Sequence, residues 1–301
     1  MAGPVWEERI VRGTHPAVRV EHEVRYRVAA ALIGGSPVWA DLGCGNGIAA
    51  REALGERLPE RVLLVDNSED ALAQAPRELN ASGIRTLQAD LTSPDDLDRI
   101  RRELTADDAP GGCVTAFEVI EHLTDFVPII ELLVELAEGN GFTSVLSVPN
   151  DAFWSIDNPF HVTKWGAGAF EELRRLLPPE HVVAHQQAVH GSIAAFGDDL
   201  DPPAVRVEPA PIPVPTHFLA AFGPAAGHLH PAAGVAGVDL LEQRRWERQR
   251  ESDCAHLQAT EQRLRSELEF WKTEIEDWRK YIRELEERLG LPTSKTDARA
   301  E

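Results

Sequence analysis

The sequence predicts an α/β protein: a doubly wound, mostly parallel sheet with an antiparallel edge hairpin, followed by a long coiled-coil helix. Three observations support this fold class. Short apolar runs alternate with longer mixed segments up to about residue 222, a glycine-rich turn follows the first run, and a heptad pattern fills the charged segment after residue 239. The length of 301 residues accommodates one large domain and a smaller element.

The alternating segments predict a sheet covered by helices on both faces. The apolar runs predict buried parallel strands at Val38–Leu42, Arg61–Asp66, Arg85–Asp90, Cys113–Val119 and Ser144–Val148. The segments between them predict helices at Ile48–Leu58, Glu69–Asn80, Pro94–Leu104 and Phe126–Ala137. In such a sheet, ligands bind at the carboxyl ends of the strands.

Two later runs, His181–His190 and Thr216–Phe222, predict strands joined by a segment that includes the proline-rich Asp201–Pro215. We expect these strands to form an antiparallel hairpin at one edge of the sheet. Together with the preceding elements they define a first domain at residues 1–222.

The remainder of the chain predicts a linker, a helix and a tail. Residues 223–238 are rich in Ala, Gly and Pro and read as a linker, 239–290 as a coiled-coil helix, and 291–301 as a disordered tail. Heptad position a holds Leu268, Ile275, Ile282 and Leu289, and position d holds Leu257, Leu264, Trp271, Trp278 and Leu285. This 4-3 spacing is typical of a coiled-coil seam. The alternative is a single amphipathic helix packed on the first domain.

Charges beside the seam favour a parallel homo-oligomer of two or three chains. Glu267 with Lys272, and Glu274 with Arg279, lie at g and the following e, where a parallel neighbour meets opposite charge. Alternatively, the helix docks the chain on partner enzymes.

Composition argues against a nucleic-acid partner and against secretion. Fifty acidic residues against thirty basic ones give a net charge of −20, which disfavours binding to the phosphate backbone of a nucleic acid. Cys44, Cys113 and Cys254 are too few and too widely spaced for a disulfide framework or a zinc pattern. The sequence has neither a signal peptide nor an apolar run of ~20 residues, so we expect a cytoplasmic protein without a membrane span.

The clearest motif is Asp41-x-Gly43-x-Gly45-x-Gly47, at the end of the first predicted strand. Three glycines let the backbone turn tightly and approach a ligand beside a helix N-terminus. An acid before them repels a pyrophosphate and suits a cationic ligand. The motif therefore favours a sulfonium cofactor carrying an amino group over a dinucleotide.

Two further acids follow at the ends of the next strands. Asp66 lies about 20 residues beyond the glycine loop, the spacing of a ribose-binding acid. Asp90, at the end of the third predicted strand, is placed to accept a hydrogen bond from an adenine amino group.

With these motifs and Phe117-Glu-Val-Ile-Glu-His-Leu123, residues 20–222 resemble the class I S-adenosylmethionine-dependent methyltransferases, which have a Rossmann-like sheet. The resemblance implies S-adenosylmethionine as cofactor and S-adenosylhomocysteine as product. It also implies that Glu21–Tyr26 belong to an N-terminal helix folded over the cofactor, or to a packing helix. The implied cofactor-binding residues are Asp41, Gly43, Cys44, Gly45, Gly47, Asp66, Asn67, Asp90, Leu91 and Glu118.

The fourth predicted strand leads into Glu118, Glu121 and His122, where a methyl group would be delivered. Methyl transfer to a hydroxyl needs alignment and a group that accepts the proton. We predict Glu118, His122 and His161 as catalytic residues, with either histidine as the base. Alternatively, His122 only orients a neighbouring loop.

Downstream, Ser147-Val-Pro-Asn150 and Asn158-Pro-Phe-His161 resemble bacterial methyltransferases of glycan and sugar pathways. The resemblance implies O-methylation of a sugar hydroxyl in glycan or secondary-metabolite biosynthesis, without a metal. Four aromatic residues are candidates for stacking on a sugar: Phe153, Trp154, Phe160 and Trp165. For Phe153 and Phe160, packing within the protein is favoured over stacking.

Two other functions use the same chain. Glu118, Glu121, His122 and His161 resemble the metal site of small-RNA 3′-terminal 2′-O-methyltransferases, in which a divalent ion would hold a ribose diol. Alternatively, the protein is a coiled-coil scaffold with a non-catalytic methyltransferase fold. The intact glycine loop argues against loss of cofactor binding but does not prove turnover.

Overall fold

A computed structural model describes residues 10–11, 13–81, 83–106, 111–154, 160–186, 215–230 and 240–290. The chain divides into two compact units, residues 1–239 and 240–301. The predicted tail, the second half of the predicted linker (231–238) and the segment that joins the two late strands lie outside the described residues.

A seven-stranded sheet forms the centre of the first unit, in the order β3-β2-β1-β4-β5-β7-β6. Its strands are β1 (Val38–Leu42), β2 (Arg61–Asp66), β3 (Ile84–Gln88), β4 (Gly112–Phe117), β5 (Phe142–Pro149), β6 (His181–Gln186) and β7 (His217–Phe222). Strands β1 to β5 are parallel, whereas β7 is antiparallel to both β5 and β6. The predicted mostly parallel sheet and its antiparallel edge hairpin are confirmed.

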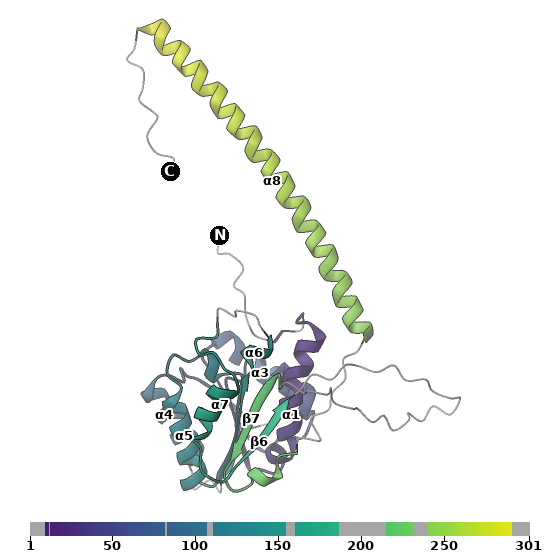
Figure 1. Ribbon diagram of the computed structural model, residues 1–301, viewed down its shortest axis with the longest axis vertical. Helices are drawn as coiled ribbons and strands as arrows, with labels where there is room; N and C mark the ends of the chain where they lie inside the picture. Colours follow the sequence, from purple (N-terminus) through teal and green to yellow (C-terminus); the bar gives the residue numbers. More distant parts are fainter. Residues whose placement is uncertain are drawn as a thin grey trace, which may run out of the picture. The chain divides into compact units, whose positions relative to one another are not determined.

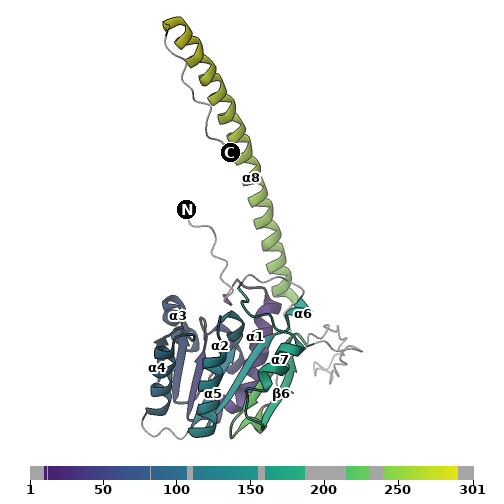
Figure 2. The ribbon, with the colours of Figure 1, turned by 60° about the vertical axis from the view of Figure 1, so that its left-hand side comes forward.

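Helices cover both faces of this sheet. One apolar core packs α1 (Pro16–Gly34), α2 (Ile48–Leu54) and α3 (Glu69–Leu79) against the sheet. A second core, on the other face, packs α4 (Pro94–Thr105), α5 (Val127–Gly139) and α7 (Ala167–Arg174). Figures 1 and 2 show α4, α5 and α7 on the same side of the sheet. The two-layer cover agrees with strands that are apolar on both faces.

Polar residues at the ends of the elements explain where several of them begin and stop. Ser68 and Ser93 cap α3 and α4, because each hydroxyl accepts a hydrogen bond from a backbone N–H of the first turn. Gly55, with φ +62°, ends α2 four residues before its predicted end. Short helices also follow the strands at η2 (Ile120–His122), α6 (Asp151–Trp154) and η3 (Ala226–His228).

The start of the predicted linker belongs to the first unit, which corrects the domain boundary at residue 222. Ala226 and Leu229 are buried in the core beneath α1, and the His230 N–H donates to the Val28 carbonyl. The small residues of this segment show no apolar periodicity in the sequence. Burial of Ala226 and Leu229 is nevertheless enough to hold the segment against the first unit. The linker therefore does not begin before about residue 230.

The described part of the second unit is one 50-residue helix, α8 (Leu240–Leu289), with Gly290 after it. Its helical state and its bounds agree with the sequence prediction. Whether it pairs with another helix stays a prediction. None of the helices in the described ranges combines the length and the apolar character needed to span a membrane.

Candidate functional site

The predicted cofactor residues lie in a row, because they follow four strands that are neighbours in the sheet. Asp90 follows β3, Asp66 ends β2, Asp41 lies in β1 and Glu118 follows β4. All four strands are parallel, so their carboxyl ends meet at one edge.

The glycine loop folds back on β2 and leaves one face open. The N–H groups of Gly43 and Cys44 both donate to the Val65 carbonyl, at 2.8 and 3.0 Å. Gly43 and Gly45 have φ of +75° and +54°, the left-handed region that favours glycine. A Cβ on Gly43 would lie 2.3 Å from Cγ2 of Val119, whereas a Cβ on Gly45 would meet nothing within 4 Å. The loop therefore has free space beside Gly45, where a ligand can approach the backbone.

Asp66 is buried and fastens this loop. Its Oδ2 accepts from the Gly45 N–H and its Oδ1 from the Ser68 N–H, each at 2.9 Å. These bonds hold the carboxylate beside the open face of the loop. The assignment of Asp66 to ribose stays a prediction, and the structure adds a role in shaping the loop.

The predicted cofactor residues that follow β2 and β3 are divided between surface and core. Asp90 is exposed, and its Oδ1 accepts from the backbone and the hydroxyl of Thr92, at 2.8 and 2.7 Å. Asn67 is exposed, and Leu91 is 7% exposed. An apolar side chain and an exposed carboxylate at one strand end suit a flat, polar-edged ring.

Asp41 is enclosed between α1 and the sheet. The Tyr26 hydroxyl donates to its Oδ2 at 2.8 Å, and the Thr115 hydroxyl donates to its Oδ1 at 2.6 Å. Burial, only partly offset by the bonds from Thr115 and Tyr26, raises the pKa of Asp41 to about 7. Asp41 thus joins α1 to β1 and β4, a role that its position in the motif did not indicate.

Glu118 has a backbone conformation that is rare outside glycine. Its φ is +54°, which costs an L-residue about 1–2 kcal/mol. Ser147 holds the residue there, since its Oγ accepts from the Glu118 N–H at 3.2 Å and donates to Oε1 at 2.8 Å. A strained residue that is held in place this way is typical of functional sites.

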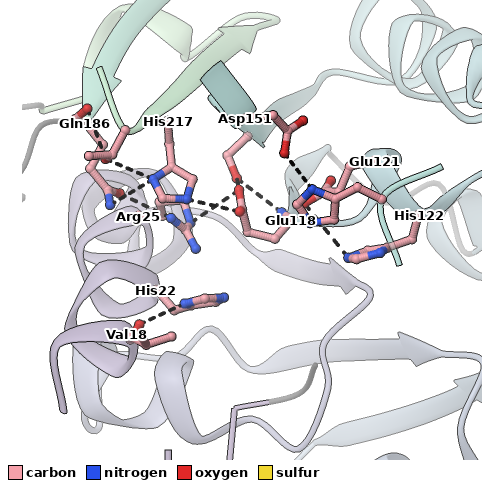
Figure 3. A network of polar contacts seen from close by, with 12 residues as sticks. Val18, His22, Arg25, Glu118, Glu121, His122, Asp151, Gln186 and His217 are labelled. Carbon is pink, nitrogen blue, oxygen red and sulfur yellow. Dashed lines mark hydrogen bonds and ion pairs between the residues drawn. The ribbon is translucent and has the colours of Figure 1, made fainter. Parts of the chain in front are cut away.

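Figure 3 shows that Glu118 belongs to a polar network joining four elements. His217 on β7 lies with Nε2 3.1 Å from Oε2 of Glu118, and its Nδ1 lies 3.2 Å from Nε2 of Gln186 on β6. The Oε1 atom of Gln186 accepts from Arg25 of α1 at 3.3 Å. That bond orients the Gln186 amide, so that its NH₂ donates to His217 and the His217 Nε2–H donates to Glu118.

The network keeps Glu118 ionised. Burial by itself would raise the pKa of its carboxyl, but Arg25 and His217 together hold it well below the usual range. The Arg25 Nε atom lies 3.9 Å from Oε1 of Glu118, and the Arg25 side chain is fully buried. Burial and the nearby guanidinium lower the pKa of His22 to about 3. A carboxylate whose pKa is held well below the usual range, as in Glu118, is a poor proton acceptor. Glu118 therefore suits charge stabilisation better than general-base catalysis.

Two histidines predicted to be catalytic lie beside each other: His122 ends η2, and His161 lies on the loop before α7. The rings of His122 and His161 are 5.3 Å apart. Nδ1 of His161 is 2.8 Å from Oδ1 of Asp151, and Nδ1 of His122 is 3.1 Å from the Phe160 carbonyl. These partners favour the Nδ1–H tautomer of both rings. Nε2 of each ring is then the nitrogen that takes a proton or a metal.

Three of the four residues predicted as alternative metal ligands lie close together, and the fourth, Glu118, does not belong to this group. One potential ligand atom each from Glu121, His122 and His161 lies within 4.8 Å of the others. Glu118 is not in this group, because Arg25, His217 and Ser147 hold its carboxylate. The four-ligand prediction is therefore corrected to three. The Nδ1 bonds described above are of the kind that orient histidine ligands on metals.

The structure describes the side chains of three of the four aromatic residues near the histidines. Phe153 and Phe160, for which we expect packing, are instead 36% and 43% exposed. Trp165 is 3% exposed and packs near Phe126, with ring centroids 5.3 Å apart. The side chain of Trp154 and all of Asn158 lie outside the described residues. Phe160, whose carbonyl lies 3.1 Å from Nδ1 of His122, thus has an exposed side chain next to the histidine pair.

Sequence reasoning missed Arg25, Asp151, Gln186 and His217 as site residues. Arg25 and Gln186 are 161 positions apart, so only the folded sheet brings them together. Asp151 and His217 do carry a local signal, since both lie next to predicted strand ends on the ligand-binding side of the sheet.

Comparison with known proteins agrees with this arrangement. Residues 40–145, from β1 to β5, match a family model described as a methyltransferase domain. No curated protein matches the chain.

Similar solved structures include the methyltransferase domain of bacterial CtHen1, which is 21% identical with a TM-score of 0.44 over 67% of this chain and 98% of that chain. A SAM-dependent methyltransferase from Archaeoglobus fulgidus is 17% identical, with a TM-score of 0.44 over 68% and 93% of the two chains. The N-methyltransferase NodS from Bradyrhizobium japonicum WM9 is 16% identical, with a TM-score of 0.40 over 69% and 97%.

Proposed function

We propose that this chain is an S-adenosylmethionine-dependent methyltransferase that methylates a sugar hydroxyl in glycan or secondary-metabolite biosynthesis. The observation that carries the proposal is the methyltransferase-domain match over residues 40–145, which contains the glycine loop, Asp66 and Asp90. The free space beside Gly45, next to a buried carboxylate, supports the same cofactor. Glycan as the acceptor class rests on the loops around Asn150 and His161, which resemble those of bacterial methyltransferases of glycan and sugar pathways.

The residues at the strand ends fit the parts of the cofactor. Asp66 would accept the ribose hydroxyls and Asp90 the adenine amino group, with Leu91 beneath the ring. Glu118 stays ionised and its side chain is 14% exposed, which suits the cationic amino group of the methionyl part. When bound, S-adenosylmethionine supplies a methyl carbon that its positively charged sulfur activates.

His161 is the residue we assign as the base. The Asp151 carboxylate accepts from its Nδ1–H, so Nε2 is the ring nitrogen that would accept the proton that an acceptor hydroxyl loses. The His161 side chain is 11% exposed, so surrounding protein limits its motion. Phe153 and Phe160 would stack on the apolar face of a sugar and bring its hydroxyl to this nitrogen.

Variants of the histidine pair test the assignment. We expect His161→Gln to lower kcat by about 10²–10⁴-fold while the affinity for S-adenosylhomocysteine, measured by calorimetry, stays within a few-fold of wild type. Asp151→Asn should also lower kcat, because the Nδ1 partner loses its charge. The matched variant His122→Gln should keep most of the activity. Equal losses in His122→Gln and His161→Gln would contradict a single-base mechanism.

A second candidate function is supported by the group of Glu121, His122 and His161. Two imidazoles and a carboxylate can bind Mn²⁺ or Mg²⁺, and such an ion could hold the diol of a terminal ribose. Titration of the wild-type protein with Mn²⁺ in a calorimeter tests this candidate. Binding that both His122→Gln and His161→Gln abolish would favour it over the metal-free enzyme.

A further inference from the structure

Helix α8 carries an exposed apolar stripe along its C-terminal half. The stripe consists of Leu264, Leu268, Trp271, Ile275, Trp278, Ile282, Leu285 and Leu289. Leu285 is half-buried, and the exposed fractions of the others run from 48% for Ile282 to 68% for Leu289. Soluble proteins rarely leave a continuous apolar surface of this kind uncovered. The stripe is therefore an interaction surface.

The spacing of the stripe indicates what shape of partner covers it. The intervals from Leu264 to Leu289 alternate strictly between four and three residues. A straight α-helix drifts by about 20° per heptad relative to this repeat, so the stripe winds slowly around α8. A partner that stays on the stripe must wind with it, as another helix does in a left-handed supercoil. A flat domain face does not meet this requirement.

We propose that the partner is a second copy of α8, packed parallel and in register. In that arrangement Glu267 at g meets Lys272 of the other copy at e, and Glu274 meets Arg279 in the same way. An antiparallel pairing would instead set the basic e residues of the two copies against each other and would bring Glu267 near Glu274. Lys272 pairs with Glu269 on its own helix at 2.7 Å, but both side chains are more than half exposed, so this pair is weak and can exchange.

The residues at the a and d positions of α8 agree with self-association. Ile275 and Ile282 at a are β-branched, which favours parallel pairing of two strands, while Trp271 and Trp278 at d are large enough to fill a three-stranded core. Upstream of Leu264 the seam includes Glu261 at a. Its carboxylate already forms an ion pair with Arg265 on the same helix, at 2.6 Å, which lowers the repulsion between copies.

The first test is the mass of the full chain in solution by light scattering. We expect a mass of two or three chains for wild type, and of one chain for the double variant Ile275→Asp with Ile282→Asp. The matched control, Thr273→Asp with Lys280→Asp, puts the same charges at two f positions on the outer face and should keep the wild-type mass. A monomeric wild type, or an unchanged mass in the seam variant, would overturn the proposal.

Disulfide trapping tests the orientation and does not require a destabilised variant. Cys254 is first replaced by serine, because Cys44 and Cys113 are buried whereas Cys254 is exposed. Leu268→Cys and Ile282→Cys are then oxidised separately, with Ser266→Cys on the outer face as the control. A parallel, in-register pair crosslinks at both a positions and not at Ser266→Cys. An antiparallel pair brings at most one of the two positions together, so a crosslink at one site or at neither contradicts the proposal.

Discussion

At the scale of single residues, Gly43 and Gly45 have left-handed backbones for different reasons. Gly43 lies against the loop after β4, where the side chain of Val119 fills the space a Cβ would need. Gly45 faces open space on the side where we place the cofactor. One glycine thus serves packing, and we propose that the other gives a ligand access to the backbone.

Alanine at these positions separates the two roles. We expect Gly43→Ala to lower the free energy of unfolding by about 2–4 kcal/mol, from backbone strain plus overpacking. Gly45→Ala should cost only the strain, about 1–2 kcal/mol, but should weaken S-adenosylhomocysteine binding at least tenfold. Urea unfolding and calorimetry measure the two effects.

Gly55→Ala is the matched control for strain. Gly55 has φ +62° and open space around it, at the other end of α2 from the glycine loop. This variant should lose stability yet keep the affinity for S-adenosylhomocysteine. Wild-type affinity in Gly45→Ala would mean that the open face of the loop is not where the cofactor lies.

The raised pKa of Asp41 predicts that the stability of the protein depends on pH. Burial raises its pKa from an ordinary 3.8 to about 7, so between these values the folded state holds a proton that the unfolded state has lost. The free energy of unfolding therefore falls as pH rises from about 4 to 7, by up to about 4 kcal/mol from this residue. Asp41→Asn removes the titration. Urea unfolding at pH 5 and pH 8 should show a smaller difference in the variant than in wild type, and equal differences would contradict the buried position of the carboxyl.

At the scale of elements, the network around Glu118 holds α1 to three strands. Arg25 lies on α1, Glu118 after β4, Gln186 on β6 and His217 on β7. A buried guanidinium without its counter-charge costs about 3–5 kcal/mol. The network is therefore expected to couple the N-terminal helix to the strand ends that carry the candidate site.

A double-mutant cycle measures this coupling. Glu118→Gln should lower the free energy of unfolding by about 3–5 kcal/mol, because Arg25 remains buried and charged. Combining it with Arg25→Met should cost less than the sum of the two single changes, with a coupling of about 1–3 kcal/mol. Since Glu118 stays ionised well below neutral pH, the loss should be similar from pH 5 to pH 8.

The surface pair Arg175 and Glu172 is the control for this cycle. Both side chains are about 70% exposed, and they form an ion pair at 2.6 Å. Glu172→Gln should change stability by less than about 1 kcal/mol. If Glu118→Gln changed stability no more than this control, the network would have no structural role.

The elements themselves were largely predictable from sequence, whereas their contacts were not. Apolar runs bounded by glycine or acid residues identified β1 and β2 to the residue, because both strands are buried on two faces. The end of α2 at Gly55 and the packing of Leu229 depended on tertiary contacts that no local pattern reports. At the site, the motif residues lie along one sheet edge as predicted. The side chains that set their charge, Arg25 and His217, come from distant parts of the chain.

At the scale of the whole molecule, the chain joins a Rossmann-like unit to a long helix with an exposed apolar stripe. The net charge of −20 favours small or weakly charged acceptors over an RNA backbone. Parallel pairing of α8 would bring two or more copies of the first unit to the same end of one coil. The variants that test pairing of α8 change no residue of the candidate site.

Sugar O-methylation is tested by transfer of labelled methyl from S-adenosylmethionine to two extracts, one of glycan precursors and one of small RNAs, each with and without a chelator. We predict label in the glycan extract that the chelator does not reduce and that His161→Gln abolishes. Label in RNA that disappears with the chelator would contradict this and would make Glu121, His122 and His161 metal ligands. Cofactor binding without transfer to either extract would instead indicate a scaffold that holds the cofactor but does not turn over.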